Sequence, residues 1–266
     1  MTTQELPTIL YSVEDGVAVV RLNRPDRMNT LGGSMKEDLA TAFFTLARGN
    51  PDVRCVVITG SGDKAFCAGA DIKERAGNRP HPAEYFVHQQ ATHDLFRRIE
   101  TFERPVIAAI NGVALGGGLE IALSCDIRIA ASHARLGLPE VKLGVIPAAG
   151  GTQRLPRAIG ESAAKELMFT GRLISAEEAL AYRLVSRVTS PETLMDTAMT
   201  LARQIAEQPP LAVAFAKHAV NTGLQVGIDE GLNYERYAAA MLVDTEDRKE
   251  GMRAFVEKRK PVFRGR

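Results

Sequence analysis

The chain has 266 residues, which is enough for one or two domains and for a large buried core. Its 33 Lys and Arg residues nearly balance 32 Asp and Glu residues, so the formal charge is only +1. The charge balance therefore gives no reason to expect nucleic acid or an anionic membrane as a partner. The remaining composition, 45% hydrophobic and 24% charged, is that of an ordinary globular protein.

The sequence also argues against several locations and kinds of site. Its apolar runs are too short to span a bilayer, and the polar segment 1–10 lacks the basic and apolar regions of an export signal. The three cysteines, Cys55, Cys67 and Cys125, form no CxxC pair, which argues against a disulfide framework and a cysteine-rich zinc site. We expect a cytoplasmic protein in a reducing compartment.

Short β-branched runs alternate with amphipathic stretches over the first two thirds of the chain. In chain order, the patterns predict a strand at 16–22, a helix at 34–48 with Ser34 as its N-cap, a strand at 53–59, a helix at 84–102, and strands at 105–110 and 126–131. These strands are apolar throughout rather than strictly alternating, which favours parallel pairing with both faces of the sheet covered.

After about residue 145 the strand signals fade and the chain is predicted to be mostly helical. Helical periodicity covers residues 161–170, 176–182, 193–207, 211–222 and 230–242. The polar segment 75–82, which is rich in helix breakers, is the best candidate for a mobile loop. The basic residues near the C-terminus, Lys258 among them, fit either a solvated helix end or a contact with phosphate.

Several familiar catalytic motifs are missing from the sequence. The five histidines show neither HxxxH nor HExxH spacing, so we expect surface or structural histidines and no metal site. No GxSxG sequence points to a serine hydrolase. The glycine run 116–118 lacks the patterns of a dinucleotide-binding turn and of a P-loop.

Two glycine-bearing turns, 66–71 and 112–120, each follow a predicted strand. Glycine at the start of a helix lets a ligand approach unpaired backbone N–H groups, where the helix dipole favours negative charge. Two such turns that converge on one carbonyl oxygen would form an oxyanion hole from backbone amides alone. Tight packing of helix against strand is the alternative explanation of the same glycines.

Two glutamates lie in apolar surroundings close to these turns in the sequence. Glu120 follows the triple glycine directly, and Glu140 follows Pro139 within an apolar segment. A carboxyl group in an apolar setting tends to have a raised pKa, which suits proton transfer near neutral pH. Glu120 could instead merely complement a helix N-terminus.

The sequence closely resembles the enoyl-CoA hydratase (crotonase) family over nearly its whole length. The resemblance rests on five ordered segments: LNRPDRMNTL (22–31), AFCAGADIKE (65–74), PVIAAINGVALGGGLEIALSCDIRIA (105–130), LPEVKLGVIPAAGGTQRL (138–155) and TEDRKEGMRAFVEKRKP (245–261). It implies an α/β fold, with a crotonase-like spiral of ββα repeats in residues 1–200 and a C-terminal helical oligomerisation region in residues 201–266.

The resemblance further implies an acyl-CoA thioester substrate and a homotrimer or dimer of trimers. Coenzyme A is then part of the substrate, and no separate cofactor, metal, nucleic acid or membrane is expected. The backbone N–H groups of Ala68 and Gly117 would bind the thioester oxygen. Glu120 would take a proton from the attacking water, and Glu140 would deliver a proton to the α-carbon on the same face, which gives syn hydration.

The resemblance also implies residues that bind the substrate. These are Asp26, Arg27, Met28, Ala70, Asp71, Ile72, Gly116 and Lys258. Lys258 would lie near the nucleotide phosphates of an acyl-CoA that is bound to a neighbouring subunit. Ala148 stands where the family often has glycine, and it preserves the turn only if its φ is negative.

The resemblance leaves other activities open. An enoyl-CoA isomerase, or a specialised acyl-CoA dehydratase, would use the same scaffold. The isomerase would need Glu140 but not Glu120. A protein that binds acyl-CoA or RNA without turnover is the alternative outside enzymology. The acidic residues among the basic residues of the tail, such as Asp247 and Glu250, weaken a case for RNA.

Overall fold

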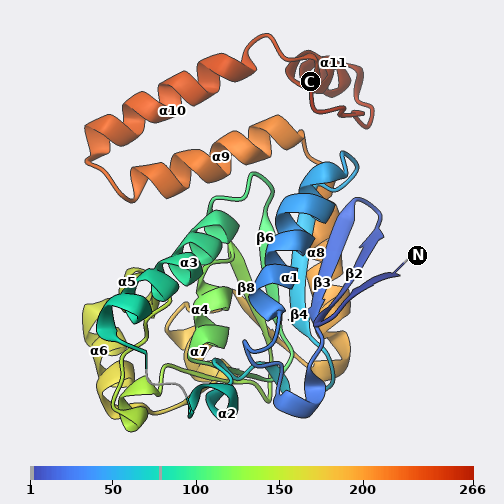
Figure 1. The fold of residues 1–266 in the computed structure, drawn as a ribbon. Coiled ribbons are helices and arrows are strands. Elements are labelled where there is room, and N and C mark those ends of the chain that lie inside the picture. The colour runs from blue at the N-terminus through green and yellow to red at the C-terminus, as the bar shows by residue number, and fades with distance from the viewer. Residues whose placement is uncertain (1–2, 78–79) are drawn as a thin grey trace.

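The computed structural model describes residues 3–77 and 80–266 and shows a mixed α/β body beneath a pair of long helices (Figure 1). The strands are β1 (Thr3–Leu6), β2 (Ile9–Glu14), β3 (Val17–Leu22), β4 (Cys55–Gly60), β5 (Ala65–Cys67), β6 (Val106–Ile110), β7 (Val113–Leu115), β8 (Ile127–Ala131), β9 (Arg135–Gly137), β10 (Ile174–Ser175) and β11 (Arg187–Thr189). The predicted strands at 16–22, 53–59, 105–110 and 126–131 are confirmed as β3, β4, β6 and β8.

Helices make up most of the remaining chain. They are α1 (Met35–Thr41), α2 (Ile72–Arg75), α3 (Pro82–Glu100), α4 (Gly117–Leu123), α5 (Gly151–Ile159), α6 (Glu161–Thr170), α7 (Ala176–Ala181), α8 (Leu194–Ala206), α9 (Pro210–Gly223), α10 (Ile228–Leu242) and α11 (Glu246–Glu257). Short 3-10 turns are η1 (Pro25–Arg27), η3 (Glu140–Leu143) and η4 (Pro191–Thr193), and α1 continues as a π-helical segment, η2 (Ala42–Ala47). The predicted mobile loop 75–82 includes residues 78 and 79, which lie outside the described residues.

The large sheet has seven strands in the order β1-β2-β3-β4-β6-β8-β11, and the small sheet has four in the order β10-β9-β7-β5. Pairing from β3 to β11 across the large sheet is parallel, as predicted, whereas the β1–β2–β3 edge is antiparallel. Each repeat sends one strand to the large sheet and the next to the small sheet before a helix follows. The pairs β4 and β5, β6 and β7, and β8 and β9 show this alternation, which is the expected spiral of ββα repeats.

Both faces of the large sheet are covered because its strands carry apolar residues at successive positions. Val57, Ile107 and Ile129 face one way and pack with α8 in one cluster of buried residues. Val56 and Ile58 point the opposite way, into the main core that includes α1 and the helices around the small sheet. The alternation of side chains across a strand therefore builds two cores from one sheet.

Three predictions from the sequence differ from the structure. Strands do not end near residue 145, because β10 and β11 follow it; they have only two and three residues, which is too short for periodicity to reveal. The edge strands β1 and β2 also escaped prediction. Ser34 does precede α1, but its hydroxyl donates to the Asp38 carboxylate at 2.9 Å and does not cap the helix.

The C-terminal region divides at a different point from the one predicted. A boundary at 200/201 falls inside α8, and Ala202 and Ala206 belong to the cluster beneath the large sheet. The helices α9 and α10 instead lie above the body as a separate pair, with α11 beside them (Figure 1). Residues up to Ala206 thus belong to the body.

In the described part of the chain, no helix combines the length and the apolar character needed to cross a membrane.

Candidate active site

A pocket of about 180 Å³ lies where the ends of β5 and β7 meet the N-terminus of α4. Seven of the predicted site residues line it: Ala68, Ala70, Ile72, Gly116, Gly117, Glu120 and Glu140. They come from segments that are far apart in the sequence, and the parallel pairing of β5 with β7 brings the two glycine-bearing turns side by side. The structure therefore joins the two turns that the sequence singled out.

Glu120 is held firmly on one side of this pocket. It lies in the first turn of α4, its side chain is almost fully buried, and its Oε1 accepts hydrogen bonds from the Ala149 and Gly151 amides, both at 2.7 Å. Burial raises the pKa of Glu120, although the two amides and the charges of Arg154 and His93 oppose that shift. Both hydrogen bonds go to Oε1, which leaves Oε2 available for a water molecule.

Glu140 occupies the other side of the pocket under different conditions. It is the first residue of η3, and its Oε2 is buried without a hydrogen-bond partner in the described residues. Burial, reinforced by the nearby charge of Glu120, raises the pKa of Glu140 to about 7. A carboxyl group with such a pKa is partly protonated near neutral pH, as proton transfer requires.

The backbone at the triple glycine fits closely around Glu140. Gly116 has φ +50°, a conformation that glycine adopts readily. A β-carbon at this position would lie 2.7 Å from Glu140 Oε1. Glycine at 116 therefore permits both the turn into α4 and the close approach of the carboxylate.

The structure contradicts one predicted donor, Ala68. Its N–H donates to the Met28 carbonyl at 3.0 Å and is therefore not available to a substrate oxygen. The N–H groups of Ala70 and Gly117 have no acceptor among the residues that the structure describes. They also lie near each other, because a β-carbon built on Gly117 would be 3.9 Å from the Ala70 nitrogen.

Five of the predicted binding residues do not line this pocket in the single chain: Asp26, Arg27, Met28, Asp71 and Lys258. The first three form or follow the turn η1, where Asp26 and Arg27 are exposed. Lys258 is exposed at the C-terminal end of α11. The single chain therefore does not bring these residues to the carboxylates.

The side chain of Asp71 is engaged with neighbouring residues of its own chain. Its buried carboxylate accepts hydrogen bonds from Thr30 and from the Glu74 amide, and it pairs with Arg24 at 3.3 Å. Burial is the largest influence on this group, but the hydrogen bonds and Arg24 together lower the pKa of Asp71. Asp71 thus caps α2 and holds the loop that positions Ala70.

Helix α3 supplies pocket residues that the sequence did not identify individually. Tyr85, Gln89 and Thr92 line the pocket from one face of the helix. The side chains of Gln89 and His93 donate to the Ala148 carbonyl, one turn apart on that face. Spacing of i and i+4 is the signal that could have paired them.

Ala148 itself satisfies the condition set from the sequence. It is not among the described non-glycine residues with positive φ, so alanine is compatible with the turn. The backbone at this position therefore does not require the glycine that the family often has there.

The cysteines and the possible metal-binding side chains of the described residues offer little to catalysis. All three cysteines are buried, and burial raises the pKa of each thiol to about 12. The structure, within its described ranges, contains no group of three or more His, Cys, Asp and Glu side chains arranged to hold a metal ion.

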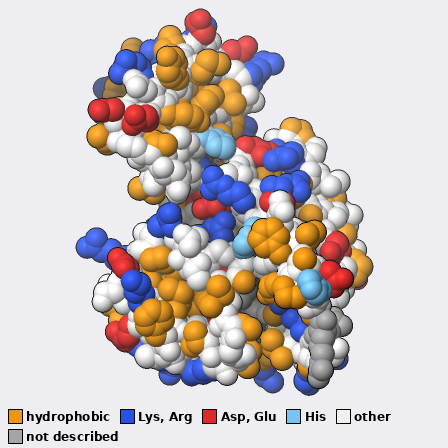
Figure 2. Space-filling view, turned by 60° about the vertical axis from the view of Figure 1, so that its left-hand side comes forward, with side chains coloured by type: hydrophobic (Ala, Val, Ile, Leu, Met, Phe, Trp, Pro, Cys, Tyr) orange, Lys and Arg blue, Asp and Glu red, His pale blue; other side chains and the backbone are white. Residues whose placement is uncertain are grey.

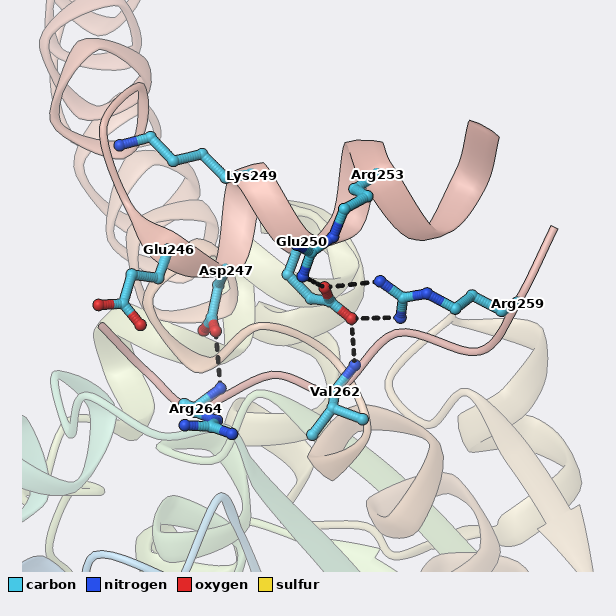
Figure 3. A pocket seen from close by; sticks show the side chains of 8 residues that line it. All are labelled: Glu246, Asp247, Lys249, Glu250, Arg253, Arg259, Val262 and Arg264. Carbon is cyan, nitrogen blue, oxygen red and sulfur yellow. Dashed lines mark hydrogen bonds and ion pairs between the residues drawn. The ribbon is translucent and has the colours of Figure 1, made fainter. Parts of the chain in front are cut away.

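A second pocket lies at the C-terminus, but its charges are engaged with one another (Figure 3). Glu250 accepts hydrogen bonds from Arg259, Arg253 and the Val262 amide, and all three contacts lower the pKa of Glu250, Arg259 most. Asp247 accepts from the Arg264 amide at 2.6 Å. The basic residues of the tail therefore serve mainly to fold it back onto α11.

Known proteins resemble this chain over almost its entire length. The profile of the enoyl-CoA hydratase/isomerase family matches residues 12–266. The chain belongs to the enoyl-CoA hydratase/isomerase family. It is 45% identical to the short-chain-enoyl-CoA hydratase of Clostridium acetobutylicum, over 96% of this chain and 97% of the relative, and 44% identical to the crotonyl-CoA hydratase of Syntrophomonas wolfei, over 96% and 97%.

The fold also matches family members of known structure. The crystal structure of an enoyl-CoA hydratase from Bacillus anthracis superposes with a TM-score of 0.93 at 44% identity, covering 97% of this chain and all of that one. The crotonase-like fold expected from the sequence is confirmed.

Proposed function

We propose that this member of the family is an enoyl-CoA hydratase, which adds water reversibly to a 2-enoyl-CoA and gives a 3-hydroxyacyl-CoA. The observation that carries the proposal is the pair of carboxyl groups, Glu120 and Glu140, in one pocket beside two free backbone amides. One carboxyl group is fixed by hydrogen bonds and the other has a pKa of about 7. Such a pair can hold one water molecule and share one proton.

In this proposal the thioester oxygen accepts hydrogen bonds from the N–H groups of Ala70 and Gly117. Negative charge grows on that oxygen as an enolate forms, so the two donors stabilise the transition state more than the ground state. Ala70 replaces Ala68 in this role because the Ala68 N–H is already bonded to Met28. The helix dipole of α4 adds to the attraction at Gly117.

The two glutamates then divide the proton transfers. Glu120 takes a proton from the water as the water oxygen bonds to the β-carbon. Glu140 gives its proton to the α-carbon as the enolate collapses. The sum of these steps is the addition of H and OH across the double bond, with one proton passed to Glu120 and one lost from Glu140. Dehydration reverses each step.

We expect no separate cofactor, because coenzyme A belongs to the substrate and the amides stabilise the enolate. The turn Asp26–Met28 would lie along the adenosine and pantetheine of the acyl-CoA. Lys258 forms no ion pair within the described residues, unlike its neighbours Arg259 and Lys260. It is therefore free to meet a nucleotide phosphate bound to an adjacent subunit.

We further propose that the protein assembles as a homotrimer or a dimer of trimers through its C-terminal helices. Figure 2 shows hydrophobic side chains gathered on the upper lobe, which these helices form. Large apolar side chains there are exposed, with Phe255 86% exposed: Val220, Leu224, Ile228, Leu232, Tyr237, Met241, Val243, Met252, Phe255 and Val256. Monomeric proteins rarely leave so many in contact with water. Light scattering should give a mass of three or six chains, and a monomer at micromolar concentration would contradict the assembly.

The activity is tested by the loss of absorbance of the conjugated enoyl thioester in crotonyl-CoA. We expect rapid loss with the wild type, and rates lower by about 10²- to 10⁴-fold with Glu120→Gln and with Glu140→Gln. Glu177→Gln, at an exposed position on α7, is the matched control and should keep the wild-type rate. A folded wild-type protein that leaves crotonyl-CoA and longer 2-enoyl-CoA esters unchanged would overturn the proposal.

The same variants separate a hydratase from an isomerase. An isomerase would shift the double bond of a 3-enoyl-CoA, and it would lose that activity in Glu140→Gln but keep it in Glu120→Gln. Loss of hydration in both variants supports the hydratase.

A further inference from the structure

The turn 148–151 is held from two sides, and only one of them is the active site. Its Ala149 and Gly151 amides point inward and donate to Glu120. Its Ala148 carbonyl accepts hydrogen bonds from Gln89, which lines the pocket, and from His93. Its Ala149 carbonyl accepts from Arg154 on the outer side of the turn. The position of the Glu120 carboxylate therefore depends on what fixes the outer side of the turn.

Arg154, in the second turn of α5, is bonded to that outer side. Its Nη1 donates to the Ala149 carbonyl at 3.1 Å, which belongs to the same residue whose amide donates to Glu120. Its Nη2 donates to Glu100 Oε2 at 2.9 Å, and Arg97 donates to the same oxygen at 2.9 Å. The guanidinium thus connects the end of α3 to the turn.

The setting of Arg154 is not one that stability alone explains. Its side chain is only 15% exposed, and its Nε is buried without a hydrogen-bond partner in the part of the chain that is described. Leaving a buried donor unpaired has a free-energy cost. Gly150 makes room for the guanidinium, because a β-carbon at that position would clash with Arg154 Nη1.

We infer that Arg154 is a positioning residue for the proposed hydration, which fixes the 148–151 turn so that its two amides hold the Glu120 carboxylate against the water. The inference rests on the proposed function for its chemistry, whereas the contacts of Arg154 itself are with Ala149 and Glu100, outside the carboxylate pair. Arg154 does not touch the substrate in this arrangement. It acts through Ala149.

The charge of Arg154 provides a second effect that a purely structural role lacks. The groups that face Glu120 are the carboxyl group of Glu140, the imidazole of His93, the two amides and the Arg154 guanidinium. Arg154 and His93 favour the ionised form of Glu120, which is the form that accepts a proton from water. Loss of the guanidinium should therefore raise the pKa of Glu120 further.

The test compares Arg154→Met, Arg154→Lys and the control Arg157→Met with the wild type. Arg157 lies one turn further along α5 and donates to Gln153, not to the 148–151 turn. With crotonyl-CoA we expect Arg154→Met to lower kcat by about 10- to 100-fold while KM changes less than about 3-fold, since a displaced catalytic group impairs the transition state more than binding. The acidic limb of its pH profile should move to higher pH.

The lysine variant and the control sharpen the result. Arg154→Lys keeps the charge but cannot bond both the Ala149 carbonyl and Glu100 as the guanidinium does. The acidic limb of its pH profile should therefore stay in place while kcat falls. Arg157→Met should match the wild type in both. Arg154→Met with a kcat within 3-fold of the wild type, or with no larger a loss than Arg157→Met, would overturn the inference.

Hydrogen exchange provides a readout that needs no activity. Backbone amides in a peptide covering residues 146–155 should exchange about 10-fold faster in Arg154→Met than in Arg157→Met, while the strands of the large sheet exchange as in the wild type. Unchanged exchange in that peptide would overturn the inference even if the wild type proved to have another activity. A hydratase-inactive wild type with faster exchange in Arg154→Met would instead overturn only the proposed function.

Discussion

The two walls of the pocket hold their carboxyl groups in opposite ways. On the α4 wall, Glu120 is tied to two amides of a turn that is itself held from outside. On the η3 wall, Glu140 has a buried oxygen with no partner among the described residues. The first arrangement stabilises both the fold and one position of the carboxylate. The second leaves a carboxyl group in an unfavourable environment, which is the condition that prepares it to exchange a proton near pH 7.

A substitution at Gly116 should disturb the Glu140 wall more than any other change considered below. Gly116→Ala places a β-carbon 2.7 Å from Glu140 Oε1 and forces alanine into a positive φ, so the carboxylate must move. We expect kcat for crotonyl-CoA to fall by about 100-fold. Gly49→Ala, at a position with open space around it and no positive φ, is the control. Wild-type turnover in Gly116→Ala would show that Glu140 does not need its present position.

The pH profile tests whether the pair shares one proton. The productive enzyme carries a single proton on Glu120 and Glu140, and the pair loses it as the pH rises through the Glu140 pKa of about 7. We therefore expect kcat/KM for hydration and for dehydration to fall together above about pH 7, by roughly tenfold per pH unit. A profile that stays level to pH 9 in both directions would contradict this assignment.

Thermodynamic stability should distinguish the two walls as well. Glu120→Ala leaves the Ala149 and Gly151 amides without their acceptor, and we expect the free energy of unfolding to fall by about 1–3 kcal/mol. Glu140→Ala removes a carboxyl group that has an unpartnered oxygen among the described residues and is unfavourably ionised at pH 8, so the free energy of unfolding should not fall and should tend to rise. Denaturant titration at pH 8 measures both. Equal losses would mean that the walls do not differ in this way.

The pH dependence of melting gives a subtler form of the same test. The folded-state pKa of Glu140, about 7, lies above the ordinary glutamate value of 4.5. Folding is therefore favoured most below about pH 4.5, and that contribution is lost as the pH rises through 7. Glu140→Gln, which cannot ionise, should melt with the wild type near pH 4.5 and above it at pH 8. A constant difference in Tm across this range would contradict the raised pKa.

The smallest effect is expected at Ala148. Its carbonyl, which accepts from Gln89 and His93, is unchanged in Ala148→Gly, and its φ does not require glycine. We expect kcat for crotonyl-CoA to remain within about 3-fold of the wild type. A larger loss would assign the methyl group itself to the packing of the turn.

Much of the architecture could be predicted because its signals are local. The apolar runs of β4 and β6 and the periodicity of α6 and α8 depend on residues close together in the sequence. The short strands β10 and β11 gave no such signal, because pairing with distant strands decides them. The same holds for the boundary of the C-terminal region, which depends on the contacts of Ala202 and Ala206 beneath the sheet.

At the site, residue types were easier to predict than hydrogen bonds. Glu120 and Glu140 were identified because carboxyl groups in apolar segments are conspicuous. Ala68 was chosen over Ala70 because a sequence cannot show which amide in a turn is already bonded, and here the Met28 carbonyl decides it. The interactions of the Asp71 carboxylate were equally invisible in the sequence. Its partners, Thr30 and Arg24, lie some forty residues away in the chain.

The buried cysteines have one more consequence. Thiols react with alkylating agents as thiolates, and a pKa of about 12 leaves almost none of that form at neutral pH. Cys67 ends β5, next to the turn that carries Ala70, whereas Cys55 begins β4 in the large sheet. The rate at which iodoacetamide alkylates Cys67 and Cys55 would therefore report how fast each of two distinct parts of the fold opens to solvent.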